Sequence, residues 1–180
     1  MNVTIINYNI GNLGSLLNSL YKACGDLSKD INVKVSSCPY EILNSDKVIL
    51  PGVGDFSSCK KQLNGIPGMI ESINEYVNKL ARPFLGICIG MQLMAKKSYE
   101  RGEHLGLNYI NSEVIKIESK PNKIKVPHMG WNTVKLNNIN EYANFNSLNN
   151  KDFYFVHSFK MQCKRKNDVL ASFQYGTEIT

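Results

Sequence analysis

Long hydrophobic runs are absent from this 180-residue sequence. No apolar segment approaches the ~20 residues that a helix needs to cross a lipid bilayer. The opening, MNVTIINY, has neither the basic start nor the apolar core of a secretory signal. We therefore expect a soluble, cytoplasmic protein with no membrane partner. Hydrophobic residues make up 43% of the chain and charged residues 20%, which is typical of a globular protein.

Closely spaced metal ligands are also absent. The cysteines form no C-x-x-C pair and the three histidines are scattered, so we expect no metal site, and nothing in the sequence calls for an organic cofactor. Without an export signal, the thiols are expected to be reduced. The five cysteines are Cys24, Cys38, Cys59, Cys88 and Cys163.

Basic clusters are rare, although the formal net charge is +6. Only CKRKN, residues 163–167, gathers basic side chains, whereas nucleic-acid-binding proteins usually concentrate them on one face. A solvated basic surface, an acidic protein partner or an anionic substrate accounts for the charge equally well. We therefore expect no nucleic-acid partner.

The order of the expected elements predicts an α/β fold. Before residue 110, apolar β-branched runs alternate with segments of helical spacing, which favours a mainly parallel sheet flanked by helices. Strands are expected within residues 3–8, 33–37, 47–54 and 83–87, and helices at about 13–24, 55–63 and 68–80. Short β-like runs follow at residues 112–117, 132–136, 152–159 and 169–175 and predict an additional antiparallel part in the C-terminal half. No repeat or linker divides the chain, so we expect one domain.

The segment FLGICIGMQLM, residues 84–94, holds Cys88 between Gly86 and Gly90. In the pattern G-x-nucleophile-x-G, a strand turns sharply into a helix and exposes the nucleophile, while the glycines allow the chain segments to cross closely. A helix that begins near Ile89 would direct N–H groups at the sulfur and lower the thiol pKa below its free value of about 8.5. A nucleophilic thiolate is one interpretation, and a packed cysteine in a glycine-containing turn is the other.

A second glycine-rich turn, LPGVGDF at residues 50–56, also follows an expected strand. Its backbone N–H groups could face Cys88 across the ends of neighbouring strands and form an oxyanion hole. An ordinary strand-to-helix loop is the alternative, because turn chemistry alone explains this composition.

Four segments in this order resemble the class I, or Cys-triad, glutamine amidotransferases: PGVGDF, FLGICIGMQLM, KVPHMGWN and FYFVHSF. The similarity is greatest to the glutaminase subunits of imidazole glycerol phosphate synthase, and NYNIGNLGSL and LGLNYINSEV extend it over essentially the whole chain. The resemblance implies a flavodoxin-like α/β fold with a mainly parallel central sheet. It also implies glutamine hydrolysis and delivery of ammonia to a (β/α)8-barrel partner in a heterodimer.

The resemblance implies a role for individual residues, with Cys88 as the nucleophile that forms a γ-glutamyl thioester. Gln92 would otherwise be a solvated helix residue, Glu100 a helix-end charge and Trp131 a core aromatic. The implied oxyanion groups are Gly52, Val53, Gly54 and the N–H of Ile89; the substrate contacts are Gln92, Glu100, His157, Ser158 and Phe159; and the residues towards the partner are Asn12, Pro127, His128, Met129, Gly130 and Trp131.

The sequence departs from the family pattern at two places. The usual opening DYGxGN is NYNIGN here, so Asn7 and Asn9 replace an acid and a glycine. The family's general base and its orienting carboxylate come from a His-Pro-Glu motif on a late strand, and the sequence contains no such motif.

We expect the 180 residues to stop short of the final strands and helix of a single amidotransferase domain, because ASFQYGTEIT predicts a strand and turn that break off mid-hairpin. A naturally shortened, catalytically silent protein is the alternative. His157 is a further candidate for the base, since it follows an apolar strand run and histidine is the usual partner of a catalytic cysteine. Glu178 has no histidine two residues before it.

Three functions follow from these observations. The leading hypothesis is a glutaminase subunit that supplies ammonia for histidine biosynthesis. Because of Asn7 and Asn9, a paralogous subunit that supplies ammonia for amidino groups on bacterial surface sugars remains an alternative. A non-catalytic scaffold that keeps the partner-binding surface without a complete triad is the third.

Overall fold

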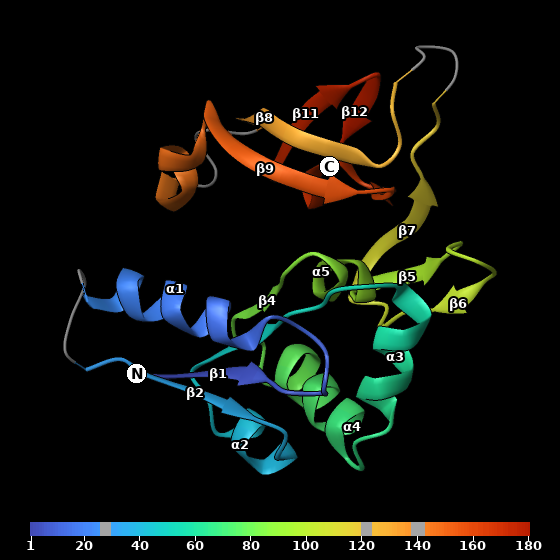
Figure 1. Ribbon diagram of the computed structural model, residues 1–180. Helices are drawn as coiled ribbons and strands as arrows, with labels where there is room; N and C mark the ends of the chain where they lie inside the picture. Colours follow the sequence, from blue (N-terminus) through green and yellow to red (C-terminus); the bar gives the residue numbers. More distant parts are fainter. Residues whose placement is uncertain (26–29, 120–123, 138–142) are drawn as a thin grey trace. The chain divides into compact units, whose positions relative to one another are not determined.

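The computed structural model describes residues 1–25, 30–119, 124–137 and 143–180 (Figure 1). The chain forms two compact units, Met1–Met94 and Ala95–Thr180. The expectation of one domain over residues 1–180 stays a prediction.

The N-terminal unit is built on a parallel sheet with the strand order β2-β1-β3-β4. The strands are β1 (Asn2–Ile6), β2 (Asn32–Ser36), β3 (Lys47–Leu50) and β4 (Phe84–Gly86). All four were expected, although β1 ends at Ile6 rather than at residue 8. This order is the flavodoxin-like one, in which ligands bind beyond the carboxyl ends of the strands.

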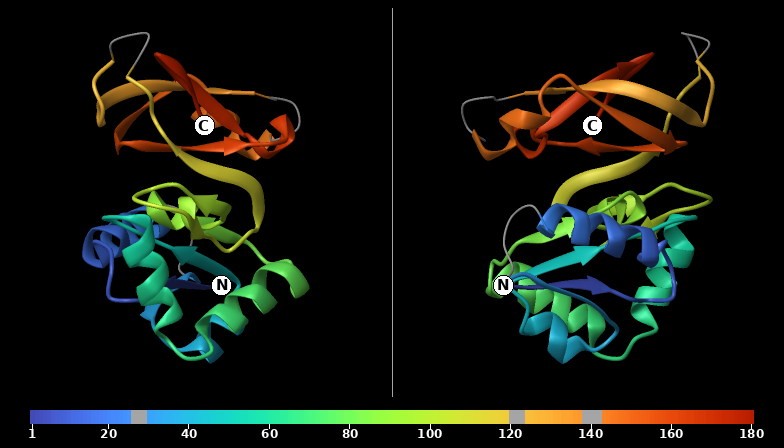
Figure 2. Two further views of the ribbon diagram at one scale, coloured as in Figure 1. Left: turned by 90° about the vertical axis from the view of Figure 1, so that its right-hand side faces the viewer. Right: turned by 60° about the vertical axis from the view of Figure 1, so that its left-hand side comes forward.

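Helices cover both faces of this sheet (Figure 2). On one face lies α1 (Leu13–Gly25), and on the other α2 (Pro39–Leu43) contacts β1 and α4 (Met69–Asn74). The leucines of α1 recur at the i, i+3, i+4, i+7 spacing that places them on one helix side. They are Leu13, Leu16, Leu17 and Leu20, and they pack against Val3, Ile5, Val33 and Ile49 of the sheet.

The two other expected helices of this unit are confirmed. The first is α3 (Phe56–Asn64), which contacts α4. The second is α4, which continues as a π-helical turn over Glu75–Lys79. The short α2 was not expected from the sequence, since a five-residue helix has too few positions to show a periodic pattern.

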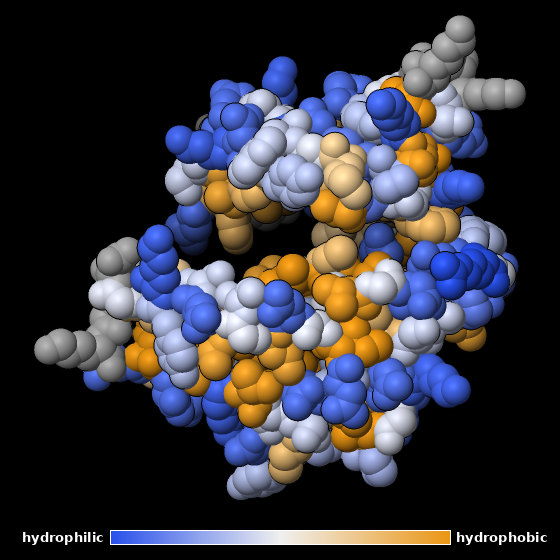
Figure 3. Space-filling model, viewed as in Figure 1, coloured by the Kyte–Doolittle hydropathy of each residue, from blue (hydrophilic) through white to orange (hydrophobic). Residues whose placement is uncertain are grey.

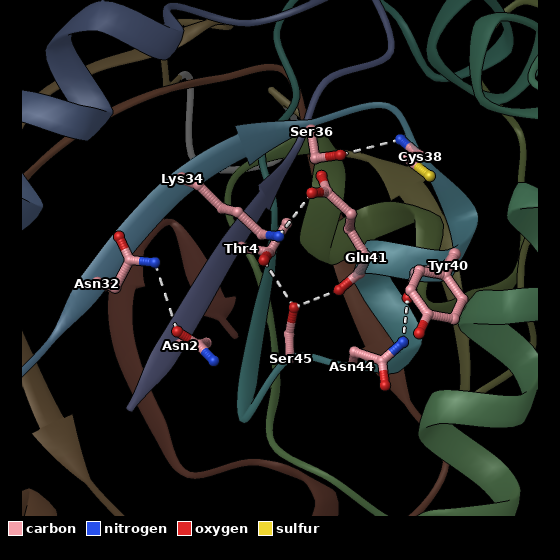
Figure 4. Close-up of polar contacts among 10 residues, drawn as sticks. All are labelled: Asn2, Thr4, Asn32, Lys34, Ser36, Cys38, Tyr40, Glu41, Asn44 and Ser45. Atoms are coloured by element: carbon pink, nitrogen blue, oxygen red, sulfur yellow. Dashed lines mark hydrogen bonds and ion pairs between the residues drawn. The ribbon is translucent and has the colours of Figure 1, made fainter.

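A buried polar contact ties the end of α2 to β1 (Figure 4). Ser45 Oγ donates to the backbone oxygen of Glu41 at 2.6 Å and also lies 2.6 Å from Thr4 Oγ1. Because Ser45 has a single hydroxyl hydrogen, Thr4 is the donor in the second bond. Lys34 Nζ lies 2.8 Å from Glu41 Oε1 and its hydrogen bond lowers the pKa of that carboxyl. Both strands β1 and β2 are thus joined to α2.

The C-terminal unit contains a mixed sheet and an antiparallel sheet. The mixed sheet has the order β10-β7-β5-β6 and comprises β5 (Ala95–Ser98), β6 (His104–Leu105), β7 (Ile110–Lys116) and β10 (Phe159–Cys163). The antiparallel sheet has the order β12-β11-β8-β9 and comprises β8 (His128–Leu136), β9 (Lys151–His157), β11 (Ala171–Tyr175) and β12 (Thr177–Ile179). Two 3-10 segments, Ala143–Leu148 and Lys166–Asp168, lie between strands. The predicted antiparallel part is therefore confirmed.

Two strands of this unit were not expected. They are β5 and β6, because AKKS and HL carry no apolar alternation and pair only through tertiary contacts. The strand and turn predicted from ASFQYGTEIT form a hairpin, with Phe173 opposite Ile179 and Gly176 at φ 70° in the turn. The expectation that the 180 residues stop short of the final strands stays a prediction.

Candidate active site

Cys88 lies at a sharp turn between β4 and α5 (Ile89–Leu93). Its backbone has φ 55° and ψ −116°, which residues other than glycine rarely adopt. The flanking glycines are sterically required, because a Cβ on Gly86 would lie 2.6 Å from the Gly90 oxygen and a Cβ on Gly90 only 1.8 Å from the Leu50 oxygen. The expected strand, turn and helix around an exposed cysteine are confirmed.

The glycine-rich turn after β3 packs against the turn after β4. The two strands are parallel neighbours, so the residues that follow them meet at one edge of the sheet. A Cβ on Gly52 would lie 2.7 Å from the backbone nitrogen of Gly90 and 2.8 Å from Ile89 Cβ. The backbone at Gly52 is therefore next to the turn that carries Cys88. The oxyanion role of residues 52–54 and the nucleophilic role of Cys88 stay predictions.

Burial raises the pKa of the Cys88 thiol above its usual range, and a hydrogen bond from the Ile89 backbone N–H opposes this shift. The net direction is opposite to the lowering expected from the sequence. The physical reason is that loss of hydration disfavours the thiolate, while α5 has only five residues and contributes little favourable dipole. The short helix therefore does not account for an activated thiol, and a general base stays the expected proton acceptor.

Gln92 presents a buried polar atom close to the nucleophile. The residue is 6% exposed on α5, and among the described residues nothing hydrogen-bonds its Oε1 atom. A buried acceptor without a donor costs about 1–3 kcal/mol, which a bound ligand with an N–H group would relieve. The alternative that Gln92 is a solvated helix residue is wrong.

Two further side chains contact the glycine-rich turn and were not singled out from the sequence. Tyr8 donates its hydroxyl to the backbone oxygen of Pro51, and Cys59 donates its thiol to the backbone oxygen of Val53. Nothing in the sequence distinguishes Cys59 from the other cysteines outside the Cys88 turn. The only sequence signal for Tyr8 is its position, since a polar-tipped aromatic residue closes the first apolar run.

The chain matches a protein-family model described as glutamine amidotransferase class-I over residues 9–179. It belongs to this family. A solved structure described as a crystal structure of glutamine amidotransferase has a TM-score of 0.65 and 14% identity, and the match covers 97% of this chain and 85% of that one. This likeness concerns the fold, and it agrees with the fold class predicted from the sequence.

Curated relatives share a more specific name. The imidazole glycerol phosphate synthase subunit HisH of Pelagibacter ubique is 41% identical over 180 residues, which cover 99% of this chain and 84% of the relative. The subunit of the same name from Rhodopseudomonas palustris is 40% identical over 184 residues, with 100% and 84% covered. The chain is therefore similar to these subunits over its whole length.

In this amidotransferase, two histidines of the C-terminal unit form a hydrogen-bonded pair. His157 Nδ1 lies 3.0 Å from the Phe159 backbone oxygen, which can only accept, so this nitrogen carries a hydrogen. In the neutral ring, Nε2 then accepts from His128 Nδ1 at 2.9 Å. The remaining nitrogen, His128 Nε2, accepts from Asn132 Nδ2 at 2.8 Å. Hydrogens are therefore donated in one direction, from Asn132 through His128 and His157 to the Phe159 oxygen, and both imidazole rings are neutral.

The surroundings favour these neutral rings. Burial lowers the pKa of both histidines, and the neighbouring His157 lowers that of His128 further. The His128 ring also lies among aromatic rings, with its centroid 3.9 Å from that of Tyr175 and 5.5 Å from that of Phe155. Because both nitrogens of His157 are used inside the unit, this geometry counts against His157 as the base for Cys88.

Of the residues expected to face a partner, Met129 and Trp131 lie on one exposed side of the β8–β9 ribbon, whereas His128 is only 2% exposed. Met129 pairs with Val156, and Trp131 pairs with Tyr154, with the Trp131 and Tyr154 rings edge to face at 5.4 Å. All four side chains are exposed, and Trp131 is 69% exposed. The alternative that Trp131 is a core aromatic is therefore wrong. Val156 and Tyr154 had not been singled out, since their place depends on the strand register.

The remaining predicted residues fall in both units. Asn12 caps α1, since its Oδ1 accepts from the Ser15 N–H at 3.2 Å. Glu100 lies in the turn after β5, where its N–H donates to Ser98 Oγ at 3.2 Å, so the interpretation as a helix-end charge is wrong. The others lie in the C-terminal unit. Pro127 follows a cis peptide bond and precedes β8, Gly130 is in β8, Ser158 joins β9 to β10, and Phe159 begins β10.

Among the described residues, no three His, Cys, Asp or Glu side chains lie close enough together to hold a metal ion. Within the same residues, none of the helices has the length and apolar character needed to cross a membrane. The five cysteines are free thiols. The absence of a metal and of an organic cofactor stays a prediction.

Proposed function

We propose that this chain is the glutaminase subunit of an imidazole glycerol phosphate synthase. It hydrolyses glutamine and passes ammonia to a (β/α)8-barrel subunit, with which it forms a cytoplasmic heterodimer of histidine biosynthesis. The observation that carries the proposal is the exposed Cys88 on a strained turn, packed against the glycine-rich turn at the carboxyl edge of the sheet. The shared name of the two relatives favours the histidine pathway over surface-sugar modification.

The reaction is an acyl transfer. The Cys88 thiolate bonds to the amide carbon of glutamine, and the carbonyl electron pair moves to oxygen, where the N–H groups of Val53 and Ile89 stabilise it. The C–N bond then breaks, and ammonia leaves after receiving a proton. Water attacks the γ-glutamyl thioester, which releases glutamate and restores the thiol. The buried Gln92 Oε1 accepts a hydrogen bond from the substrate.

The proton transfers require a group that the N-terminal unit lacks. Residues 1–94 contain no histidine, and the thiol pKa is raised. The family's His-Pro-Glu histidine is the expected base, and its motif is not among the 180 residues. The contribution of the C-terminal unit is substrate contact through Glu100, His157, Ser158 and Phe159.

Partner binding is assigned to the exposed ribbon side. Protein interfaces commonly bury apolar surfaces such as the one formed by the exposed side chains of Met129, Trp131, Tyr154 and Val156. Aromatic residues contribute much of the binding energy of such surfaces. This surface would receive the barrel subunit. Asn12, Pro127, His128 and Gly130 stay predicted partner residues, although His128 is 2% exposed and would act from beneath the surface.

A glutamine-analogue electrophile tests the nucleophile in the complete protein. Mass spectrometry of the digested protein should find an adduct on Cys88 that excess glutamine prevents. Cys38 is the matched control, because it is also an exposed free thiol. Equal labelling of both thiols, or labelling of Cys88 that glutamine does not reduce, would contradict the proposal.

Affinity purification with the chain as bait distinguishes the acceptors. Recovery of the histidine-pathway barrel subunit is the expected result, whereas recovery of a sugar amidotransferase would assign the chain to the paralogous system. A complex with the barrel in which Cys88 forms no thioester from glutamine would instead identify a silent scaffold.

A further inference from the structure

Two buried side chains hold the turn that follows β3. Tyr8, which is 1% exposed, donates its hydroxyl hydrogen to the Pro51 backbone oxygen at 2.5 Å. Cys59, which is fully buried on α3, donates its thiol hydrogen to the Val53 backbone oxygen at 3.3 Å. We propose that Tyr8 and Cys59 are positioning residues that fix the oxyanion turn for glutamine hydrolysis. This inference rests on the proposed function of the same site.

Because the peptide bond is planar, a hydrogen bond that fixes a carbonyl oxygen also fixes the direction of the N–H group in the same peptide. In a trans peptide, the C=O and the following N–H point in opposite directions in one plane. Holding the Pro51 oxygen therefore sets the direction of the Gly52 N–H, and holding the Val53 oxygen sets that of the Gly54 N–H. The peptide between Gly52 and Val53, which carries the proposed oxyanion donor, is enclosed by these two fixed planes.

The packing around the turn leaves it little room to adjust. A Cβ on Gly52 would lie 3.0 Å from the Tyr8 hydroxyl oxygen, so this hydroxyl lies close beneath the turn. The start of α3, which carries Cys59, is fixed as well. Asp55 Oδ1 accepts from the Ser58 N–H at 3.0 Å and from the Ser57 hydroxyl at 2.8 Å. One anchor, Tyr8, lies two residues after the end of β1, and the other, Cys59, lies on α3.

Both anchoring groups keep their hydrogens. Burial raises the pKa of the Tyr8 hydroxyl, and the Cys59 thiol that lies beside it raises that pKa further. Burial also raises the pKa of the Cys59 thiol. Each group is therefore a hydrogen donor throughout the physiological pH range, and Cys59 is not a second nucleophile.

Tyr8→Phe tests the first anchor, and Tyr76→Phe is its matched control. Tyr76 is also fully buried and donates to a proline oxygen, that of Pro83 at 3.3 Å, at the start of β4 and away from Cys88. In the complete protein with its barrel subunit, Tyr8→Phe should lower kcat at least tenfold and leave KM within twofold, because oxyanion contacts form only in the transition state. Tyr76→Phe should leave both within twofold.

The second anchor is tested by a pair of variants at one position. Cys59→Ser keeps a donor and should retain kcat within about threefold, whereas Cys59→Ala removes the donor and should lower kcat about tenfold. Rescue by serine separates loss of the hydrogen bond from loss of packing, since alanine and serine leave similar space.

Amide hydrogen exchange provides a measurement that does not depend on glutaminase activity. The amides of Gly52, Val53 and Gly54 should exchange at least tenfold faster in Tyr8→Phe than in Tyr76→Phe. Unchanged exchange there, or a Tyr8→Phe kcat within twofold of the wild type, would overturn the inference. An unmodified protein that hydrolyses no glutamine would overturn the proposed function instead, while the exchange data would still decide whether Tyr8 fixes the turn.

Discussion

At the carboxyl edge of the parallel sheet, glycines allow neighbouring backbone segments to pack closely. The Leu50 oxygen lies where a Cβ atom on Gly90 would be, and a Cβ atom on Gly52 would contact the backbone nitrogen of Gly90. Cys88 is held at positive φ between these contacts. The strain of this conformation is therefore maintained by backbone packing, which tolerates no added atoms.

Gly90→Ala should destabilise the N-terminal unit by more than about 3 kcal/mol, beyond the usual cost of over-packing, because its Cβ would meet the Leu50 oxygen at 1.8 Å. Gly14→Ala is the control. Gly14 is exposed on α1 with nothing within 4 Å of an added Cβ, so the substitution should stabilise by about 0.5–1 kcal/mol. Urea unfolding measures both, and equal midpoints for the two variants would contradict the packing described here.

The glycine requirements at this edge could be predicted from the sequence, whereas the anchors could not. Gly86 and Gly90 flank a nucleophile in a local pattern, so five adjacent residues carry the signal. The Tyr8 hydroxyl meets Pro51, which is 43 positions away, and no local pattern indicates such a contact. The burial of Gln92 likewise depends on tertiary packing, and for this reason a solvated residue was the preferred interpretation apart from the family resemblance.

At the scale of elements, the β8–β9 ribbon has two sides with different roles. Register places Met129, Trp131, Tyr154 and Val156 on the exposed side. The other side contributes Val134 and Phe155 to a cluster with Ile117, Phe173 and Ile179. Alternation along a strand separates the two sets, so substitutions on the exposed side should affect binding more than folding.

Trp131→Ala should weaken binding of the barrel subunit at least tenfold, which corresponds to about 1.4 kcal/mol. Tyr40→Ala is the control, because Tyr40 is an aromatic residue of similar exposure, 73%, on α2. It should leave the affinity within twofold. Titration calorimetry measures both, and equal affinities would exclude the ribbon as the docking surface. The midpoint temperature of thermal unfolding of the Trp131→Ala variant should differ from that of the wild type by only a few degrees.

The histidine pair makes the same ribbon sensitive to acid. Both rings have a lowered pKa when folded, so the unfolded chain binds more protons once the pH approaches the ordinary histidine value of about 6.5. The contribution of the pair to stability should therefore be fully present above that value and fall as the pH decreases below it, before most carboxylates titrate. His157→Gln should flatten this dependence. An equal slope of the urea midpoint in both proteins would show that the pair does not titrate as described.

Elements with a strong pattern could be predicted, and elements that depend on pairing could not. The leucine spacing of α1 and the apolar runs of β1, β3 and β4 predicted the parallel sheet and its cover. The strand β5, AKKS, has only one apolar residue and exists because β7 and β6 flank it. The strand and turn of ASFQYGTEIT were predicted, whereas the pairing register of β12 with β11 could not be predicted.

At the scale of the whole molecule, the residues with predicted functional roles are divided between the two units. The nucleophile, the glycine-rich turn and Gln92 belong to the N-terminal unit, which contains no histidine. The predicted substrate contacts Glu100 and His157 and the exposed ribbon belong to the C-terminal unit. Under the proposed function, the N-terminal unit carries the nucleophile and the C-terminal unit carries the exposed surface for the partner.

The most direct test of the central claim is glutamate release by the complete protein, measured alone and with the barrel subunit and its ligand. We predict slow release alone, stimulation of at least tenfold in the complex, equivalent to about 1.4 kcal/mol of activation free energy, and no release from the Cys88→Ala variant in either state. An unstimulated rate, or activity that survives Cys88→Ala, would contradict the assignment of this chain as a partner-coupled cysteine glutaminase.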